Sequence, residues 1–371
     1  MQKLFQILKA SFKFKKPMKK KVLIFDRASI DNGMGVKFFK SSEYEILDIR
    51  FESLNIYVFF YTILKFGFNG LKFNYFKSYM EIVEPKIVYT GIDNKLDFFK
   101  LKNYYENAFF ISDQFGISKN PYASHKGKIK KDFFWHCKEY LKKTKKKLRA
   151  DILFTFGTNE ARNMSRFIHG KYYPLGSTKN NFNVHKRRKI KKIKKITFIC
   201  GGIYPATIND EKKIFRNLVM FGKKNNYEIS FLSRFDSDKE NFFRENYIKD
   251  GWKYLPRKNS NSSYNYLNNS ELIVFTHGSL GFEALSKGIR VVSFYSNFPE
   301  KSSCINYNRK GQFWSNSSNY SDFENLVKKV INYSDKEWNK IRKRFSGQIM
   351  FYDKNNKLKK KIISQIKNKN L

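Results

Sequence analysis

The stretch Glu271–Tyr295, ELIVFTHGSLGFEALSKGIRVVSFY, decides the fold class of this chain of 371 residues. Its apolar residues Leu272–Phe275 have the composition of a strand that is covered on both faces. The turn THGS follows, and the next residues predict a short helix that Ser279 caps and that ends at Gly288 in a left-handed C-cap. Arg290–Tyr295 predicts the next strand. The stretch therefore predicts one βαβ unit of a parallel sheet.

Similar apolar runs, separated by segments of helix length, occur along the whole chain. The further strands that we predict are Val22–Asp26, Tyr44–Ile49, Lys86–Thr90, Ala108–Ser112, Asp151–Phe156, Ile196–Cys200 and Glu228–Leu232. Strands that alternate with helices imply βαβ units, and the chain is long enough for two domains. We therefore predict an α/β fold with two Rossmann-like, doubly wound domains that face each other across a cleft.

A polar, strongly basic stretch in the middle of the chain predicts the boundary between these domains. It reads NNFNVHKRRKIKKIKK over 180–195 and precedes a new strand. The predicted organisation is a basic N-terminal tail (1–20), a first domain (21–180), a basic linker (181–195), a second domain (196–345) and a basic C-terminal segment (346–371). The last segment is either a helix that packs back on the first domain or a frayed end.

The charge balance limits the class of partner. The chain has 74 Lys and Arg against 32 Asp and Glu, a formal net charge of +42. Such a chain favours anionic partners: nucleic acid, anionic lipid headgroups, sugar nucleotides or acidic glycans. The excess of Lys, together with many Asn, Ile, Phe and Tyr residues, is also the composition that an AT-rich genome gives to any protein that it encodes.

Cysteine usage and hydropathy indicate a cytoplasmic protein. Cys137, Cys200 and Cys304 are far apart and form no CxxC, which argues against a zinc site or a disulfide framework. The most apolar stretch, 56–64, ends at Lys65 and is shorter than the ~20 residues that a membrane span needs. The N-terminus has no signal-peptide pattern. Its amphipathic patch and Lys cluster suggest peripheral contact with the inner face of the cell membrane, or a solvated tail.

The turn after Phe275 is the strongest candidate ligand site. A helix N-terminus offers free N–H groups and a partial positive charge, and ligands of open α/β sheets bind at the carboxyl ends of strands. Glycines there let a phosphate approach the backbone. Glu283, one turn into the helix, is within reach of a ribose. The candidate phosphate-binding residues are His277, Gly278, Ser279, Leu280 and Gly281. An ordinary βα turn would show the same residues.

Further candidates in the second half follow other strands. Gly201 and Gly202 form a tight turn after Ile196–Cys200, and Arg234 and Arg257 follow later strands, where they could pair with a diphosphate. The DxD pattern at 236–238 resembles the cation site of metal-dependent sugar transferases. It lies in a polar stretch, DSDKEN, so we predict no metal ligand there.

The first half offers candidates for acid–base chemistry. Asp93 and Asp113 each follow a predicted strand and should line the cleft between the domains. One of them, or His125, could act as general base towards an acceptor hydroxyl. A carboxylate at a strand end is also a common helix cap. The motifs of P-loop enzymes, nicotinamide enzymes and GxSxG hydrolases are absent.

Several stretches resemble one family and occur in its order. They are KIVYTGIDNKLDFFKL from Lys86, AFFISDQFG from Ala108, ILFTFGTNEA from Ile152, YYPLGSTKNN from Tyr172 and THGSLGFEALSKGIRVVSF from Thr276. The chain resembles GT-B glycosyltransferases and UDP-N-acetylglucosamine 2-epimerases, and more narrowly the bacterial surface carbohydrate biosynthesis proteins.

The resemblance implies roles for particular residues. It places Ser279, Gly281 and Glu283 on the motif that binds the diphosphate and ribose, and Asp93 with its neighbour on a DN pair. His277 stands where many relatives have Asp, and Phe115 replaces the Asn of a QNG-like turn, so the details of the donor and acceptor sites differ from the pattern.

The resemblance also implies an activity. The expected protein is a metal-independent GT-B glycosyltransferase that moves a sugar from a nucleotide-activated donor to a glycan or lipid-linked acceptor of capsule, lipopolysaccharide or a related polymer, with no cofactor besides that donor. The alternatives are a sugar-nucleotide epimerase or a polyol-phosphate transferase of the same fold. A basic nucleic-acid-binding protein would explain the net charge but not the ordered motifs, and it would need exposed aromatic residues in a basic groove.

Overall fold

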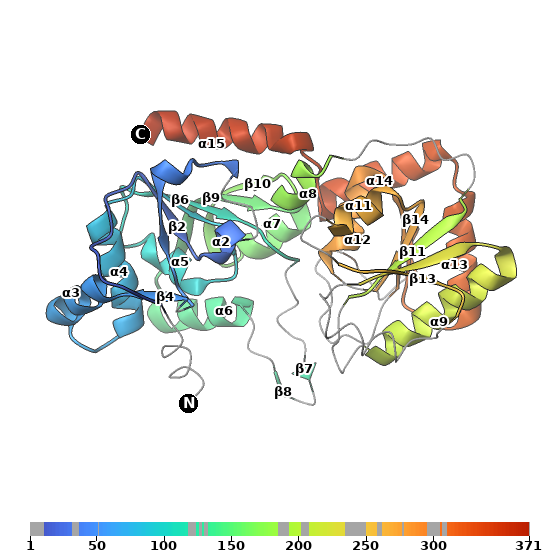
Figure 1. Cartoon of the computed structure of the whole chain (residues 1–371), viewed down its shortest axis with the longest axis horizontal. Coiled ribbons are helices and arrows are strands. Elements are labelled where there is room, and N and C mark those ends of the chain that lie inside the picture. Colours follow the sequence, from blue (N-terminus) through green and yellow to red (C-terminus); the bar gives the residue numbers. More distant parts are fainter. Residues whose placement is uncertain are drawn as a thin grey trace.

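The computed structural model contains two α/β domains and a C-terminal helix (Figure 1). The structure describes residues 11–31, 37–50, 52–117, 124–125, 128–129, 133–184, 193–201, 208–233, 250–257, 262–276, 278–294, 305 and 310–370. At 31, 124–125, 128–129 and 370 only the backbone is described.

The first domain is built on a six-stranded parallel sheet. Its strand order is β10-β9-β6-β5-β2-β3, so the connections run outward in both directions from the boundary between β2 and β5. The strands are β2 Val22–Phe25, β3 Tyr44–Leu47, β5 Ile87–Thr90, β6 Phe109–Asp113, β9 Leu148–Thr155 and β10 Ile168–Pro174. The helices are α2 Ala28–Asp31, η2 Ser41–Glu43, α3 Ile56–Phe66, α4 Leu71–Val83, α5 Leu96–Leu101, α6 Phe133–Thr144, α7 Thr158–Ser165 and α8 Thr178–Phe182.

Two short strand pairs accompany this sheet. β1 Ser11–Lys13 runs parallel to β4 Ser53–Asn55, directly before α3. β7 Ser124–His125 and β8 Lys128–Ile129 form an antiparallel pair.

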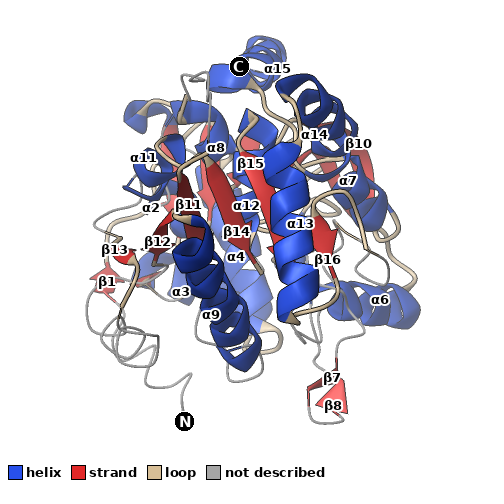
Figure 2. Cartoon of the chain, turned by 90° about the vertical axis from the view of Figure 1, so that its right-hand side faces the viewer, coloured by secondary structure: helices blue, strands red, loops and turns tan. Residues whose placement is uncertain are grey.

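The second domain repeats the architecture, with the order β13-β12-β11-β14-β15-β16, again all parallel. The strands are β11 Lys195–Ile199, β12 Glu228–Leu232, β13 Lys253–Leu255, β14 Leu272–Phe275, β15 Arg290–Phe294 and β16 Trp314–Ser315. The helices are α9 Ile208–Asn225, α11 Ser262–Asn268, α12 Ser279–Lys287, α13 Tyr320–Asn332 and α14 Asp335–Ile349. Figure 2 shows α9 and α13 on the face of this sheet nearest the viewer. The prediction of two doubly wound parallel sheets is confirmed.

The hydrophobic cores explain why these strands lack alternation. In β2, β5 and β14 every residue is buried, because helices cover both faces of each sheet. One face of the first sheet packs against α4, α5 and α6 through a core rich in phenylalanine. The opposite face has a separate core.

That second core depends on the last helix of the chain. α15, Lys357–Asn370, follows the 3₁₀ turn η3, Lys354–Asn356, begins near the second domain and runs away from it along the first domain (Figure 1). Its residues Ile363 and Ile366 are buried in the core of the first sheet with Ile24 and Tyr89. Of the two expectations for 346–371, packing on the first domain is therefore the correct one. The boundary predicted at 345 lies inside α14.

The chain crosses between the domains where two glycines allow close backbone approach. Gly157, before α7, leaves room for the end of α14, because a Cβ would collide with the Gln348 carbonyl. Gly176 has φ 79°, and a Cβ there would collide with the Phe351 carbonyl. The Phe351 N–H donates to the Phe156 carbonyl at 2.7 Å. Residues 185–192 of the predicted linker lie outside the described residues.

Candidate functional site

The start of α12 lies at the switch point of the second sheet. β11 and β14 are neighbours there, and the chain leaves them in opposite directions across the sheet. Gly278 is the N-cap residue, with φ 98°, a value that favours glycine, and it is exposed. The expectation that Ser279 caps the helix is wrong, because Ser279 is the first helical residue. Ser279 and Leu280 are half-buried beside this open helix end.

Gly281 has a packing role in this arrangement. A Cβ at this position would collide with the ring of Phe275 on β14. The glycine therefore lets α12 lie close to its own strand, and the expectation that it admits a phosphate to the backbone is not needed to explain it. Gly278, by contrast, has open space around its Cα.

Glu283 is held in a fixed orientation. Its side chain is buried, and its Oε2 accepts a hydrogen bond of 2.7 Å from the hydroxyl of Tyr264 on α11. Burial, with the negative charge of Glu283 as the next cause, raises the pKa of Tyr264 well above its usual value, so the hydroxyl stays a donor. No described residue bonds the other oxygen, Oε1, which leaves it for a ligand.

Three cationic side chains interact electrostatically with this carboxylate or with its partner Tyr264. Burial lowers the pKa of Lys287 to about 8, and the charge of Glu283 opposes the shift. Its Nζ lies 4.8 Å from the ring centroid of Tyr264 and has no hydrogen-bond partner among the described residues. Burial also lowers the pKa of Lys179, on α8, and Arg257 adds to this effect. The predicted residues Arg257 and Glu283 are thus brought into one cluster, where both act on Tyr264.

Sequence reasoning missed Glu211, which joins the two strand ends at the switch point. This buried residue of α9 accepts from the Gly201 N–H at 3.0 Å and from the Thr276 hydroxyl at 2.8 Å through Oε1. Cys200 Sγ approaches its other oxygen at 3.6 Å. Glu211 therefore fixes the backbone on both sides of the switch point. Its only signal in the sequence is an acidic residue in the first turn of a helix.

Some predicted residues lie outside the described part of the chain. They are Gly202, Arg234, His277 and the DxD residues at 236–238. For His125 the structure gives only the backbone, in β7. Their roles stay predictions.

Asp93 has the surroundings of a general base. It lies in the loop after β5, is buried, and accepts a hydrogen bond of 3.2 Å from the Phe115 N–H. Burial raises its pKa to about 7; the negative charge of Glu160 adds to the shift, and the Phe115 N–H opposes it. Glu160, on α7, is itself buried and accepts from Gln114 Nε2 at 2.8 Å. A carboxyl group with a pKa near neutrality suits proton transfer.

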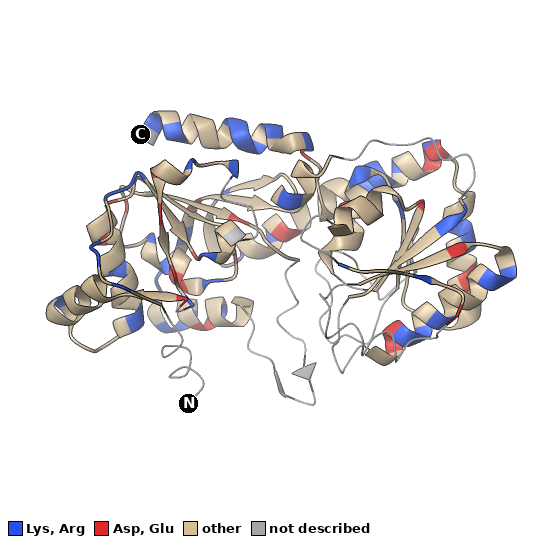
Figure 3. Cartoon of the chain, in the orientation of Figure 1, with Lys and Arg blue, Asp and Glu red and all other residues tan. Residues whose placement is uncertain are grey.

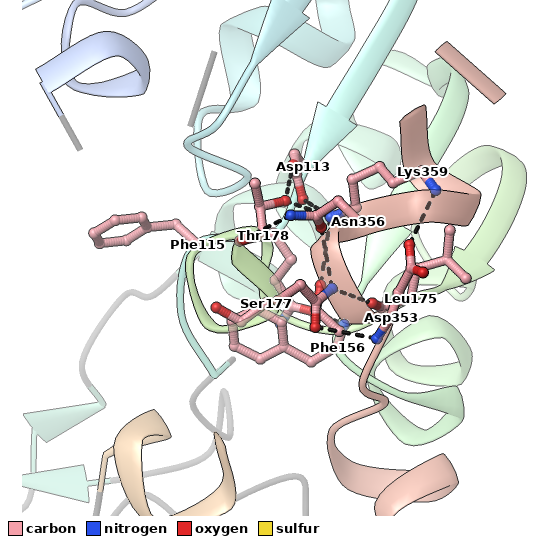
Figure 4. Close-up of polar contacts among 12 residues, drawn as sticks. Asp113, Phe115, Phe156, Leu175, Ser177, Thr178, Asp353, Asn356 and Lys359 are labelled. Atoms are coloured by element: carbon pink, nitrogen blue, oxygen red, sulfur yellow. Dashed lines mark hydrogen bonds and ion pairs between the residues drawn. The ribbon is translucent and has the colours of Figure 1, made fainter. Parts of the chain in front are cut away.

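Asp113 is a correction to the sequence-based expectation. Its carboxylate is fully buried and pairs with Lys359 of α15 at 2.8 Å, where the Lys side chain is fully buried too. The hydroxyls of Tyr89 and Thr178 also donate to it. Figure 4 shows Asp113 and Thr178 directed towards one another, while the side chain of Phe115 points away. This geometry shields Asp113 from any acceptor hydroxyl, so it holds α15 in place and is no general base.

Both halves of the candidate site border the contact between the domains. Asn180 of α8 donates to Ser286 Oγ of α12 at 3.0 Å and also approaches the Glu283 carbonyl. Ile117, two residues after Phe115, packs against the core of the second domain. The loop that carries the Asp93 hydrogen bond and the helix that carries Glu283 therefore meet the same boundary.

The described residues contain no group of three His, Cys, Asp or Glu side chains placed to hold a metal ion. In the same part of the chain, no helix combines the length and the apolar character that crossing a bilayer requires.

Two doubly wound domains, with a last helix that returns to the first of them, define the GT-B class of fold. Residues 202–369 match the model of a family described as "putative O-antigen biosynthesis protein". This match confirms the resemblance to bacterial surface carbohydrate biosynthesis proteins that the motifs predicted. No curated protein matches the chain.

Solved structures of this fold are similar over almost the whole chain. UDP-GlcNAc 2-epimerase from Neisseria meningitidis, bound to UDP-GlcNAc, is 11% identical over 95% of this chain and 100% of its own, with a TM-score of 0.51. The H548A form of the wall teichoic acid polymerase TagF is 13% identical over 95% and 90%, with a TM-score of 0.51. For TarM, the match covers 78% of this chain but only 57% of TarM, with 14% identity and a TM-score of 0.48. The likenesses to the epimerase and to TagF show the fold.

Proposed function

We propose that the protein is a glycosyltransferase that moves a sugar from a nucleotide-activated donor to an acceptor of a cell-surface glycan, capsule, lipopolysaccharide or a related polymer. The observation that carries the proposal is the pairing of an open helix N-terminus with a fixed carboxylate, Glu283, at the switch point of the second sheet. The match of residues 202–369 to an O-antigen family supports a surface glycan as the product.

The donor occupies the second domain in this proposal. Its diphosphate faces the exposed start of α12 at Gly278 and Ser279, where free N–H groups and the helix dipole favour negative charge. Oε1 of Glu283 accepts from a ribose hydroxyl while Tyr264 holds Oε2. Arg257 and Lys179 neutralise the charge that develops on the departing phosphate, so no cofactor and no metal ion is required.

The acceptor occupies the first domain. Asp93 takes the proton of the attacking hydroxyl, since its pKa of about 7 lets it accept a proton near neutrality. Its nearness to Glu160 destabilises the charged form and so strengthens the carboxylate as a base. The proposed acceptor is a glycan or a lipid-linked saccharide, the enzyme works in the cytoplasm with peripheral contact to the anionic membrane face, and no specific nucleic acid is involved.

Two other reactions use the same fold. An epimerase and a teichoic acid polymerase share it with this chain, each at a TM-score of 0.51. The O-antigen family match favours the glycosyltransferase. Analysis of the products formed from a panel of nucleotide-activated donors distinguishes transfer of a sugar from epimerisation and from transfer of a polyol phosphate.

The test begins with the nucleotide. A thermal-shift screen against UDP, CMP, CDP, GDP and dTDP is expected to identify one that raises the melting temperature, because a ligand of the native state stabilises it by mass action. Titration calorimetry then measures its affinity for Glu283→Gln, Glu283→Ala and Ser279→Ala. We expect Glu283→Ala to weaken binding by about tenfold or more, the value of a lost hydrogen bond to a charged group.

Glu283→Gln is the informative variant, because it keeps an acceptor for Tyr264 and removes only the charge. Glu228→Ala is the matched control, since Glu228 is exposed at the opposite end of the same sheet. It should bind like the unaltered protein. Donor affinity that is unchanged in all three site variants would refute the proposed donor site.

A further inference from the structure

The outward face of α3 carries large apolar side chains in water. Tyr57, Phe60, Leu64 and Phe68, just after the helix, are 40%, 58%, 87% and 73% exposed. Their spacing of three or four residues places them on one stripe. Exposed stripes of this kind on a soluble domain are typical of an interaction surface.

The other face of α3 already packs on the protein. Val58 and Thr62 are buried, and α3 lies against α4. The helix is therefore apolar on both faces, although only one is needed for the fold. A helix that is apolar all round is normally enclosed on all sides, so the outward stripe is available for a further contact.

The stripe continues onto the neighbouring segment. β1 pairs in parallel with β4, which leads directly into α3, and Lys16 Nζ lies 5.7 Å from the ring centroid of Tyr57. Phe12, Phe14 and Met18, within or just after β1, are all exposed. We call these residues, Phe12, Phe14, Met18, Tyr57, Phe60, Leu64 and Phe68, the α3 patch. The other large exposed apolar side chains of the described residues are scattered over both domains and α15.

The two segments that carry the α3 patch contain basic residues and no acidic ones. Segment 11–21 contains six Lys and segment 56–77 contains three, and neither contains Asp or Glu. Lys13, Lys19 and Lys65 pair with acidic residues from other segments. Lys15 and Lys16 form no ion pair with any described residue. Figure 3 shows α3 with few charged residues along its length. Apolar residues bordered by Lys match a surface that is apolar below an anionic layer.

We propose that the α3 patch docks the protein on the surface of an anionic lipid bilayer. Phe60, Leu64 and Phe68 enter the boundary between headgroups and acyl chains, and the lysines contact anionic headgroups. The inference assigns a surface to the membrane contact of the proposed function, and it rests on that function for its purpose, which is to bring the acceptor domain to a lipid-linked saccharide. The contact itself is measured without catalysis.

The test is co-sedimentation of the full chain with vesicles. One set is phosphatidylcholine alone, and the other is phosphatidylcholine with an equal part of phosphatidylglycerol. We expect binding to the anionic vesicles and a loss of binding as salt is raised. Phe60→Ser with Leu64→Ser should lower the partition by about tenfold or more, since two apolar side chains no longer enter the membrane. Met220→Ser with Leu358→Ser, at exposed positions elsewhere, should bind like the unaltered protein.

Lysine variants separate local charge from net charge. Lys15→Glu with Lys16→Glu should weaken binding strongly, whereas Lys336→Glu with Lys340→Glu changes the net charge equally on exposed positions of α14 and should not. Equal binding by all variants, or equal binding to both kinds of vesicle, overturns the proposal. So does a sedimentation coefficient that falls in the Phe60/Leu64 variant, because the patch would then cover a second copy. The Phe60/Leu64 variant should keep the thermal shift with the nucleotide, because the proposed donor site lies in the other domain. Loss of vesicle binding with the thermal shift retained therefore concerns the membrane contact alone.

Discussion

At the scale of single residues, the clearest prediction concerns Asp93 and the pH dependence of stability. Its ionised form is disfavoured in the folded protein, mainly by burial and also by Glu160. When folding raises the pKa of an acid, the protein loses stability as the pH rises from the unfolded-state pKa of that acid to its folded-state pKa. Asp93→Asn should therefore stabilise the protein by about 2–4 kcal/mol at about pH 8, with a difference that shrinks below about pH 7 and vanishes near pH 4.

Denaturant unfolding at a series of pH values measures this difference. Asp97→Asn is the control, because Asp97 is a partly exposed residue of α5 in an i,i+3 pair with Lys100. It should change the stability little at any pH. The same Asp93 variant should lose sugar transfer but keep donor affinity. A variant that is less stable than the parent at high pH, or fully active, would contradict the assignment of Asp93 as the base.

The residue roles that could be predicted are those set by local sequence. Glu283 lies four positions after Ser279, so any helix that starts there brings it near the N-terminus. Asp113 could not be assigned in this way, because its partner Lys359 is 246 residues away and arrives on another element. Glu211 was missed because its two hydrogen bonds join strand ends that are adjacent only in the folded sheet.

At the scale of elements, the attachment of α15 depends on one buried ion pair. Burial lowers the pKa of Lys359, and the charge of Asp113 opposes the shift. Removing one partner leaves a buried charge without its counter-ion, which typically costs about 3–5 kcal/mol. Asp113→Asn and Lys359→Met should each destabilise the protein by about this amount and expose α15 to protease.

A double-mutant cycle tests this attachment. The combination of both substitutions should cost clearly less than the sum of the two single changes, because neither charge is then left alone. Lys361→Met, at an exposed position of the same helix, should have little effect. Additive losses, or a Lys361 variant as unstable as the Lys359 variant, would show that the pair does not hold the helix.

Nine of the twelve strands in the two sheets could be predicted, because most of their residues are apolar, which is the pattern of a parallel sheet between helices. The edge strands β10, β13 and β16 were not predicted, because they are short or only partly buried. The position of α15 could not be predicted, since a Lys-rich segment with Ile at 362, 363 and 366 fits a packed helix and a frayed tail equally well. Long-range contacts with Asp113 and Glu43 decide between them.

At the scale of the whole molecule, the relative position of the two domains depends on the fit at Gly157. α14 belongs to the second domain and ends against this residue, which precedes α7 of the first domain. The negative charge of Glu160, in the first turn of α7, contributes to the raised pKa of Asp93. A change at Gly157 therefore alters both the packing between the domains and the surroundings of the proposed base.

Gly157→Ala should separate donor binding from transfer. Its Cβ would collide with backbone atoms of Gln348, which cannot move aside as a side chain would, so overpacking should cost about 1–3 kcal/mol and shift the domains. The proposed donor site lies within the second domain, so nucleotide affinity should stay within about twofold while the rate of transfer falls about tenfold or more. Gly347→Ala, on α14 beside Gln348, is the control, because its Cβ meets no atom within 4 Å. Equal transfer rates in the two variants would show that the contact at Gly157 does not set the geometry of the reaction.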